Sequence, residues 1–265
     1  YEMANVFARL AARTRDCADL IHYFSHQEPT VVLRAIDLLP PACGDNADAV
    51  NQLARWAEEL KTPLSARTWH VPAHALQALA RVKPDVGRPF LDEAVKHPIW
   101  QVRARVAAAA EDFKDESIAQ DLAIDPSPNV RTAGLETLVR LQSPLRFEAA
   151  LASLRSDDFQ LLRTAALALR GTPEPARART VNQLFATLKR LTTGAADTSR
   201  DPRVAILERL GGLLPVERTA ELGPYREAAG RLFSLVDALA SEGTALAHVD
   251  VGGGLGIRYR DESPV

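Results

Sequence analysis

The sequence predicts an all-α fold of about six stacked helical hairpins, and three observations favour it. Ala, Leu and Arg, which form helices readily, recur throughout, whereas aromatic residues make up only 6% of the chain. A short pattern returns along the chain: a turn with Pro or Asp, then an apolar residue, Arg and a small residue. Before about residue 245, no segment shows the alternation of apolar and polar residues that is typical of a strand.

The repeated pattern marks the second helix of each hairpin. Its clearest copy is residues 125–138, Asp-Pro-Ser-Pro-Asn-Val-Arg-Thr-Ala-Gly-Leu-Glu-Thr-Leu. The Arg position returns every 28 to 40 residues, near the period of helical-hairpin repeats. It falls at positions 34, 72, 103, 131, 163 and 203, of which position 72 holds Pro. Amphipathic stretches ahead of these positions predict the first helix of each hairpin, at about 16–25, 47–60, 88–96, 115–123, 145–154 and 176–191.

Prolines and alanines explain how such hairpins would form and stack. Pro84, Pro126 and Pro173 fall between predicted helices or in their first turns, where a missing N–H breaks no helical hydrogen bond. One hairpin cannot bury its apolar faces alone, so stacking is needed to build a continuous core. Small residues such as Ala107 and Ala133 would let neighbouring helices approach closely.

The C-terminal part of the chain has a different character. Residues 221–242 predict one long helix, residues 245–251 a buried strand, and residues 252–256 form a glycine-rich loop. We therefore expect a helical repeat domain over residues 1–215 and a separate C-terminal segment over residues 216–265.

Residues 16–214 resemble HEAT repeats, and this resemblance implies an armadillo-like α-solenoid. In HEAT proteins the recurrent Arg of the second helix typically pairs with an acidic residue of a neighbouring repeat. The resemblance therefore implies a structural ladder of arginines along the stack. The alternative is a stripe of arginines that binds an acidic partner. The residues concerned are Arg34, Arg103, Arg131, Arg163 and Arg203.

The segment from Glu221 to Glu262 resembles part of diaminopimelate decarboxylase, a fold-type III enzyme that uses pyridoxal phosphate. The resemblance is most specific in the run Gly-Gly-Gly-Leu-Gly-Ile-Arg-Tyr-Arg-Asp-Glu over residues 252–262. In that family the glycine loop donates backbone N–H groups to the cofactor phosphate, since only glycine lets a backbone wrap closely around an anion. The resemblance implies this role for Gly252, Gly253, Gly254 and Gly256.

The same resemblance does not imply a complete decarboxylase site. The Schiff-base Lys of the family precedes this segment, its substrate-binding residues follow it, and residues 215–265 contain no Lys. We therefore expect a truncated or chimeric tail without decarboxylase activity, and no cofactor unless this segment is functional.

Composition narrows the classes of partner. The 32 basic and 34 acidic residues leave a net charge of -2, which gives no general attraction for nucleic acid or an anionic membrane. No apolar run approaches the ~20 residues that span a bilayer. We therefore expect a protein or peptide partner, without nucleic acid or membrane binding.

Cysteine and histidine offer few candidates for chemistry. Cys17 and Cys43 match no metal-binding spacing and are interpreted as buried free thiols, with a disulfide as the alternative. His70 and His74 lie four residues apart, as in some zinc sites, but no Glu follows His70 as the His-Glu-x-x-His motif requires, and Pro72 would disturb the helix. A polar surface position or hydrogen bonding between helices is the preferred interpretation of these histidines.

The sequence as a whole predicts a protein-interaction scaffold that presents a solenoid groove, with no catalytic residue and no metal site. One alternative is a fragment of a decarboxylase-like enzyme. Another is an accessory module of a bacterial prolyl isomerase, because similar Ala- and Arg-rich repeats accompany the cyclophilin-type isomerase domain in some bacterial proteins. Location is not determined: a cytoplasmic protein is the default, and export is compatible with a chain that does not begin with Met.

Overall fold

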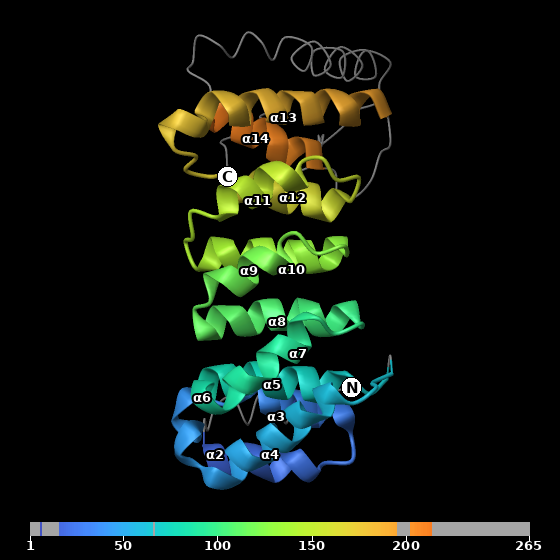
Figure 1. Cartoon of the computed structure of the whole chain (residues 1–265), viewed down its shortest axis with the longest axis vertical. Coiled ribbons are helices and arrows are strands. Elements are labelled where there is room, and N and C mark those ends of the chain that lie inside the picture. Colours follow the sequence, from blue (N-terminus) through green and yellow to red (C-terminus); the bar gives the residue numbers. More distant parts are fainter. Residues whose placement is uncertain (1–5, 7–15, 66, 195–201, 214–265) are drawn as a thin grey trace, which may run out of the picture. The chain divides into compact units, whose positions relative to one another are not determined.

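The prediction of an all-α fold is confirmed (Figure 1). The structure is a computed structural model that describes residues 6, 16–65, 67–194 and 202–213. Over these residues every regular element is a helix, either α or 3-10. The predicted helix at 221–242, the strand at 245–251 and the glycine-rich loop all lie outside the described residues.

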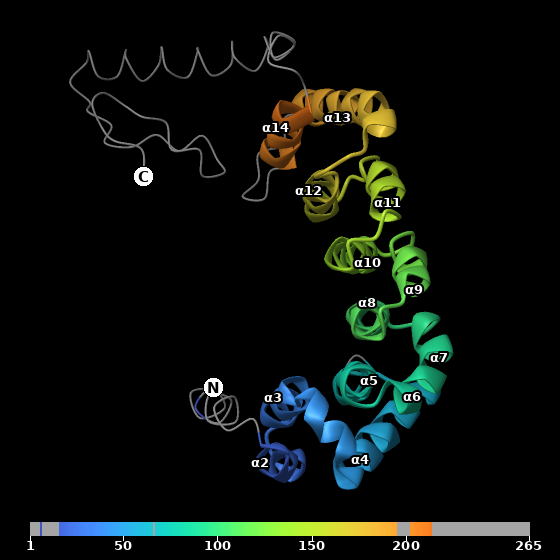
Figure 2. The same ribbon diagram turned by 90° about the vertical axis from the view of Figure 1, so that its left-hand side faces the viewer.

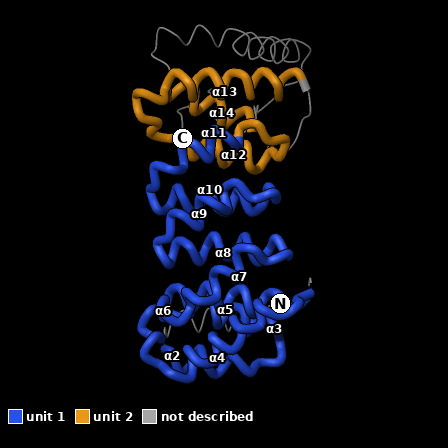
Figure 3. The backbone as a smooth tube through the Cα atoms, viewed as in Figure 1, with its two compact units in different colours: residues 1–153 blue, residues 154–265 orange. Residues whose placement is uncertain are grey.

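The chain divides into two compact units, residues 1–153 and residues 154–265 (Figure 3). The boundary that the sequence predicts between residues 215 and 216 lies outside the described residues and stays a prediction. The two units are described separately.

Unit 1 consists of short helices in two layers (Figure 2). One layer contains α3, α5, α8 and α10, and the other contains α4, α7, α9 and α11. Helices α8 and α10 pack against each other and against α9, which lies between them in sequence. The α-helices are α2 (Cys17–His22), α3 (Pro29–Leu38), α4 (Ala47–Glu58), α5 (His70–Val82), α6 (Pro84–Gly87), α7 (Leu91–Val95), α8 (Trp100–Phe113), α9 (Glu116–Leu122), α10 (Pro128–Arg140) and α11 (Arg146–Ser153). The 3-10 helices are η1 (Tyr23–Ser25), η2 (Pro41–Asp45), η3 (Glu59–Lys61) and η4 (Arg88–Phe90).

Local sequence signals explain where these helices begin. The side chains of Asn46 and Asp115 accept hydrogen bonds from backbone N–H groups in the first turns of α4 and α9. Pro29, Pro84 and Pro128 start α3, α6 and α10, where their fixed φ suits the first turn. Contrary to the sequence interpretation, Pro72 does not disturb its helix: it lies in the first turn of α5, which continues to Val82. The predicted helix at 88–96 is divided between η4 and α7.

Helices α9 and α10 approach so closely at Gly134 that a side chain does not fit there. An added Cβ would lie 2.5 Å from the backbone N of Ala123 and 2.9 Å from the carbonyl O of Ala119. Thr137, one turn further along α10, donates a hydrogen bond of 2.8 Å to the carbonyl O of Ala107 in α8. Small and polar residues therefore set the distance of α10 from both of its neighbours.

Replacing Gly134 with Ala is expected to lower the free energy of unfolding by about 2 kcal/mol, because backbone atoms of α9 would have to move. Urea denaturation followed by circular dichroism measures this change. Gly211→Ala is the control: it lies in α14 of unit 2 (Pro202–Leu213), with no atom within 4 Å of the added Cβ. There Ala should stabilise the helix, by up to about 1 kcal/mol. Equal effects of the two changes would contradict this account.

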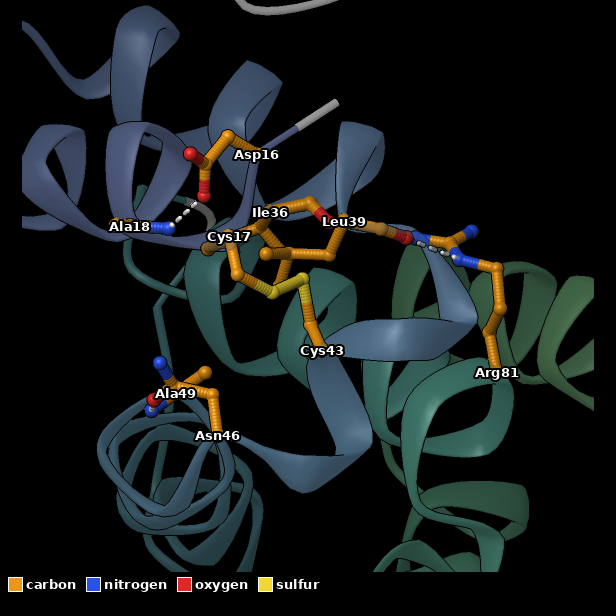
Figure 4. Close-up of a disulfide and its surroundings, with 9 residues drawn as sticks. All are labelled: Asp16, Cys17, Ala18, Ile36, Leu39, Cys43, Asn46, Ala49 and Arg81. Atoms are coloured by element: carbon orange, nitrogen blue, oxygen red, sulfur yellow. Dashed lines mark hydrogen bonds between the residues drawn. A yellow bond between two sulfur atoms is a disulfide. The ribbon is translucent and has the colours of Figure 1, made fainter. Parts of the chain in front are cut away.

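The interpretation of Cys17 and Cys43 as free thiols is wrong, because the structure joins them in a disulfide (Figure 4). Cys17 begins α2, and Cys43 lies in η2, which follows α3. The packing of these elements brings the two Cα atoms to 5.6 Å, a distance that suits a disulfide. Cys43 is fully buried beside Ile36 and Leu39, so the bond forms part of the core of unit 1.

The described part of unit 2 contains α12 (Phe159–Ala168), α13 (Glu174–Gly194) and α14. Helix α14 packs against both α12 and α13. Its side chains Ile206 and Leu210 are fully buried, as are Leu161 of α12 and Leu184 of α13. Thr187 of α13 donates a hydrogen bond of 3.2 Å to the carbonyl O of Leu154, which ties α13 to the start of the unit.

Candidate functional site

A network of polar side chains lies on α3, α5 and α8 of unit 1. These helices belong to one layer (Figure 2). We call this network the polar face. Its side chains are linked by hydrogen bonds and ionic contacts over three consecutive helices of that layer. Its members are Asp37 of α3, His74, Gln77 and Arg81 of α5, and Arg105 and Asp112 of α8.

His74 is the centre of the polar face. Its Nδ1 lies 2.7 Å from Oδ1 of Asp37, and its Nε2 lies 2.7 Å from Nη2 of Arg105. The guanidinium can only donate, so Nε2 accepts and the ring proton lies on Nδ1, facing Asp37. Only 9% of the His74 side chain is exposed. This imidazole thus bridges a carboxylate on α3 and a guanidinium on α8.

Arg81 and Arg105 fix the positions of the helices on either side of this bridge. Arg81 donates from Nε to the carbonyl O of Leu39 at 3.0 Å (Figure 4). Its Nη2 donates to the carbonyl O of Asp37 at 3.0 Å, so this arginine satisfies carbonyls at the end of α3. Arg105 donates from Nη1 to Oε1 of Gln77 (2.8 Å). Each arginine therefore connects two helices of the layer.

The electrostatics of the polar face differ between its two carboxylates. Burial opposes ionisation of Asp37, but the hydrogen bond of His74 and the charges of Arg105 and Arg81 outweigh it and lower the pKa. Burial raises the pKa of Asp112, with a further increase from Glu111, against smaller opposing contributions from Arg81 and Gln77. Burial, together with the charge of Arg105, lowers the pKa of His70. Asp37 is the firmly ionised member of the network.

The ionic contacts continue onto α10. Nε of Arg140 pairs with Glu111 of α8, and its Nη2 donates to Oγ1 of Thr137 at 3.2 Å. Glu136, one turn earlier on α10, lies 3.9 Å from Nη1 of the same arginine. Charged side chains that are paired with one another thus extend over four helices of one layer.

The arginines singled out from the sequence occupy different environments. Arg103 forms a bidentate pair with Asp125, with Nε–Oδ2 and Nη2–Oδ1 distances of 2.7 and 2.9 Å. Arg131 donates from Nη1 to the backbone O of Asp125 at 3.0 Å. Arg34 and Arg163 are exposed, and Arg203 is half-buried. The ladder over all five positions stays a prediction.

Sequence reasoning named His74 but missed the rest of the polar face. A signal was available: His74, Gln77 and Arg81 are spaced by three and four residues, and Arg105 and Asp112 by seven, so each set lies on one side of its helix. The contact between the sets depends on helix packing, which spacing does not reveal.

The described residues do not assemble a metal site: they contain no group of three or more His, Cys, Asp or Glu side chains placed to bind an ion. The predicted phosphate-binding residues Gly252, Gly253, Gly254 and Gly256 lie outside the described residues. None of the described helices is long and apolar enough to cross a membrane. Chemically, the polar face is a set of hydrogen-bonding groups that are already held in position. The group next to Nε2 of His74 is the guanidinium of Arg105, not a hydroxyl or thiol that could act as a nucleophile.

Comparisons with known proteins concern a short stretch of the chain. A segment of 44 residues, 17% of this chain, is 54% identical to diaminopimelate decarboxylase of Pseudomonas aeruginosa and covers 11% of that protein. Over 43 residues, 16% of the chain, the identity is 54% to the Vibrio cholerae enzyme and 56% to the Neisseria meningitidis serogroup B enzyme, each covered over 10% of its length. No family model and no solved structure matches. Similarity to part of a decarboxylase is therefore confirmed, and the chain spans about a tenth of these relatives.

Proposed function

We propose that this chain is a HEAT-type α-solenoid scaffold that binds a protein segment along the polar face of unit 1. The repeated Pro and Arg pattern and the two layers of unit 1 support the architecture. The observation that carries the function is the polar face itself, where paired side chains on consecutive helices are held in place by their mutual contacts.

Pre-positioning is the physical reason for assigning this face to recognition. Asp37 and Arg105 remain 30% and 32% exposed, so they retain hydrogen-bonding capacity toward solvent or a partner. Their geometry is already determined by His74 and Gln77, so binding would restrict little additional side-chain motion. Ala108, half-buried between Arg105 and Asp112 on α8, leaves room for the backbone of an approaching segment.

Photo-crosslinking tests this proposal. A benzoylphenylalanine placed at Ala108 is expected to capture a protein that the same group at Gln120, exposed on α9 in the other layer, does not capture. The captured protein, identified by mass spectrometry and purified, should bind the chain directly. Arg105→Ala should weaken that binding by roughly tenfold, the scale of a central interface arginine.

Two results would contradict the scaffold function at this face. One is the same set of adducts from Ala108 and Gln120. The other is unchanged binding by Arg105→Ala in a protein whose thermal unfolding shows that unit 1 remains folded. A loss of binding that accompanies unfolding is separated from a true interface effect by Arg105→Lys, which keeps the charge but not the forked donor geometry.

The decarboxylase similarity favours a second function, binding of pyridoxal phosphate by the C-terminal glycine loop. Its support is 54% identity over 44 residues and the run Gly252–Glu262. When bound, the cofactor supplies an electron sink for carbanion chemistry. Calorimetric titration of the chain with pyridoxal phosphate discriminates the two functions, because the scaffold function requires no heat of binding.

A further inference from the structure

The described residues of unit 2 carry an excess of positive charge. The described residues 154–194 and 202–213 contain nine Arg and Lys against four Asp and Glu, a net charge of +5, although the whole chain carries -2. Some of this charge is neutralised locally: Arg177 pairs with Glu174 at 3.0 Å, and Arg190 pairs with Asp157 at 2.6 Å. Arg163 and Arg170 have no such pair among the described residues.

Two exposed arginines lie along one face of α12 and its C-terminal turn. Arg163, Leu167 and Arg170 follow one another at intervals of four and three residues, which places them on the same side of a helix. The backbone N–H of Arg170 donates to the carbonyl O of Leu167 at 3.1 Å, so the turn continues past the last residue of α12. All three side chains are exposed, including 46% of Leu167. Phe159, partly exposed at the start of α12, precedes Arg163 by one turn.

Arg209 of α14 adds a further positive charge at this end of α12. Its Nε donates to the carbonyl O of Ala166 at 3.0 Å, so the guanidinium lies at the C-terminal turn of α12. Burial and the charge of Arg170 lower the pKa of Arg209, with a smaller opposing contribution from Glu208. Within the described chain neither Arg163 nor Arg170 forms a salt bridge, so these two exposed guanidinium groups have no acidic partner there.

We propose that this basic patch, formed by Arg163, Leu167, Arg170 and Arg209, binds an acidic protein segment that carries an apolar side chain. Carboxylates suit the guanidinium groups, which can each donate two hydrogen bonds to one carboxylate. Arg163 and Arg170 are separated by about 10 Å along the helix, at 1.5 Å per residue. A matching segment therefore has two acidic groups about 10 Å apart, on either side of an apolar residue that covers Leu167.

The apolar residues near the basic patch favour a peptide over a nucleic acid as its partner. Phe159 and Leu167 alternate with Arg163 and Arg170 along α12, so apolar and basic groups follow one another at each turn. A sugar-phosphate backbone offers no apolar group at such intervals, whereas an acidic amphipathic helix offers both kinds of side chain. This inference does not depend on the polar face of unit 1.

The test uses the full chain and a fluorescent peptide in which two Glu residues, about seven positions apart in a helical sequence, flank a Leu. Fluorescence anisotropy is expected to show saturable binding that weakens with added salt. In the double variant Arg163→Gln/Arg170→Gln, affinity should fall by roughly tenfold, as expected for two exposed charge contacts. Arg177→Gln/Lys189→Gln, which removes two charges from α13, should change it by less than about twofold.

Two further comparisons test the charge contacts and the apolar contact separately. The peptide with Gln in place of Glu should bind more weakly, and Leu167→Ser should weaken binding of the acidic peptide. Circular dichroism confirms that each variant is folded. No binding by the parent chain up to about 1 mM peptide would overturn the proposal. So would equal losses in the two double variants, or tighter binding of a single-stranded oligonucleotide of the same length at this patch.

Discussion

Removing the disulfide is expected to lower the free energy of unfolding of unit 1 by about 3.5 kcal/mol, the loop-closure value for the 26-residue separation of Cys17 and Cys43. The bond connects α2 to η2 and so restricts the unfolded chain around α3. The double variant Cys17→Ala/Cys43→Ala keeps the buried site apolar, which avoids placing a hydroxyl at the fully buried position 43. Urea denaturation of the oxidised parent and of the variant measures the difference.

The reductant itself provides the control for this prediction. Tris(2-carboxyethyl)phosphine should destabilise the parent by a similar amount and leave the double Ala variant unchanged. Alkylation of the native protein without reductant should modify neither cysteine. Rapid alkylation of both cysteines under those conditions, or an unfolding curve that the reductant does not move, would contradict a disulfide in unit 1.

Replacing Asp125 with Ala is expected to lower the free energy of unfolding by about 3 kcal/mol, because it leaves a largely buried guanidinium without its partner. Only 7% of the Asp125 side chain and 15% of the Arg103 side chain are exposed. Oδ1 of Asp125 also accepts a hydrogen bond of 2.8 Å from the backbone N of Ser127, at the start of α10. One substitution therefore removes both an ion pair and a turn contact.

The pH dependence of stability gives this prediction a second readout. Burial opposes ionisation of Asp125, but hydrogen bonds from Arg103 and Ser127 and the charges of Arg103 and Arg131 outweigh it and lower the pKa below its ordinary value of 3.8. A lowered pKa in the folded state means that the contribution is complete above that ordinary value and is lost as the pH falls through the folded pKa. The parent should therefore lose more stability between neutral and acid pH than Asp125→Ala does.

An exposed ion pair on unit 1 serves as a control that separates the effect of burial on stability from the effect of charge. Glu58 and Lys61 form a 2.8 Å pair on unit 1 in which 58% and 43% of the side chains are exposed. Glu58→Ala should change the free energy of unfolding by about 0.5 kcal/mol or less, because solvent screens the pair. If Asp125→Ala costs no more than Glu58→Ala, the Arg103–Asp125 pair does not stabilise the junction of α8 and α10.

The helical fold was predictable because its signals are local. Proline at the starts of α3, α6 and α10 and the side-chain caps at Asn46 and Asp115 act within one helical turn. The error at Pro72 has a local cause as well: its helix starts two residues earlier, at His70, so the proline still lies in the first turn. Helix type is thus readable from the sequence, and exact starting residues less so.

The candidate site was only partly predictable because its contacts are long-range. Asp37 and His74 are 37 residues apart, and His74 and Arg105 are 31 apart, so their contacts depend on how three helices pack. The pairing of Cys17 and Cys43 is long-range as well. The sequence allowed either free thiols or a disulfide, and only the approach of α2 to η2 shows that the disulfide forms.

By itself the sequence determined that this protein is built of short helices with a recurrent Arg pattern, and that one stretch resembles part of a decarboxylase. Only the tertiary structure decided which arginines are neutralised. Arg103 and Arg163 occupy the same position of the repeated pattern, yet Arg103 meets the carboxylate of Asp125 whereas Arg163 faces solvent. The physical reason is that a side chain's charge is a property of its residue type, while its partner is supplied by another helix and is therefore a property of the packing.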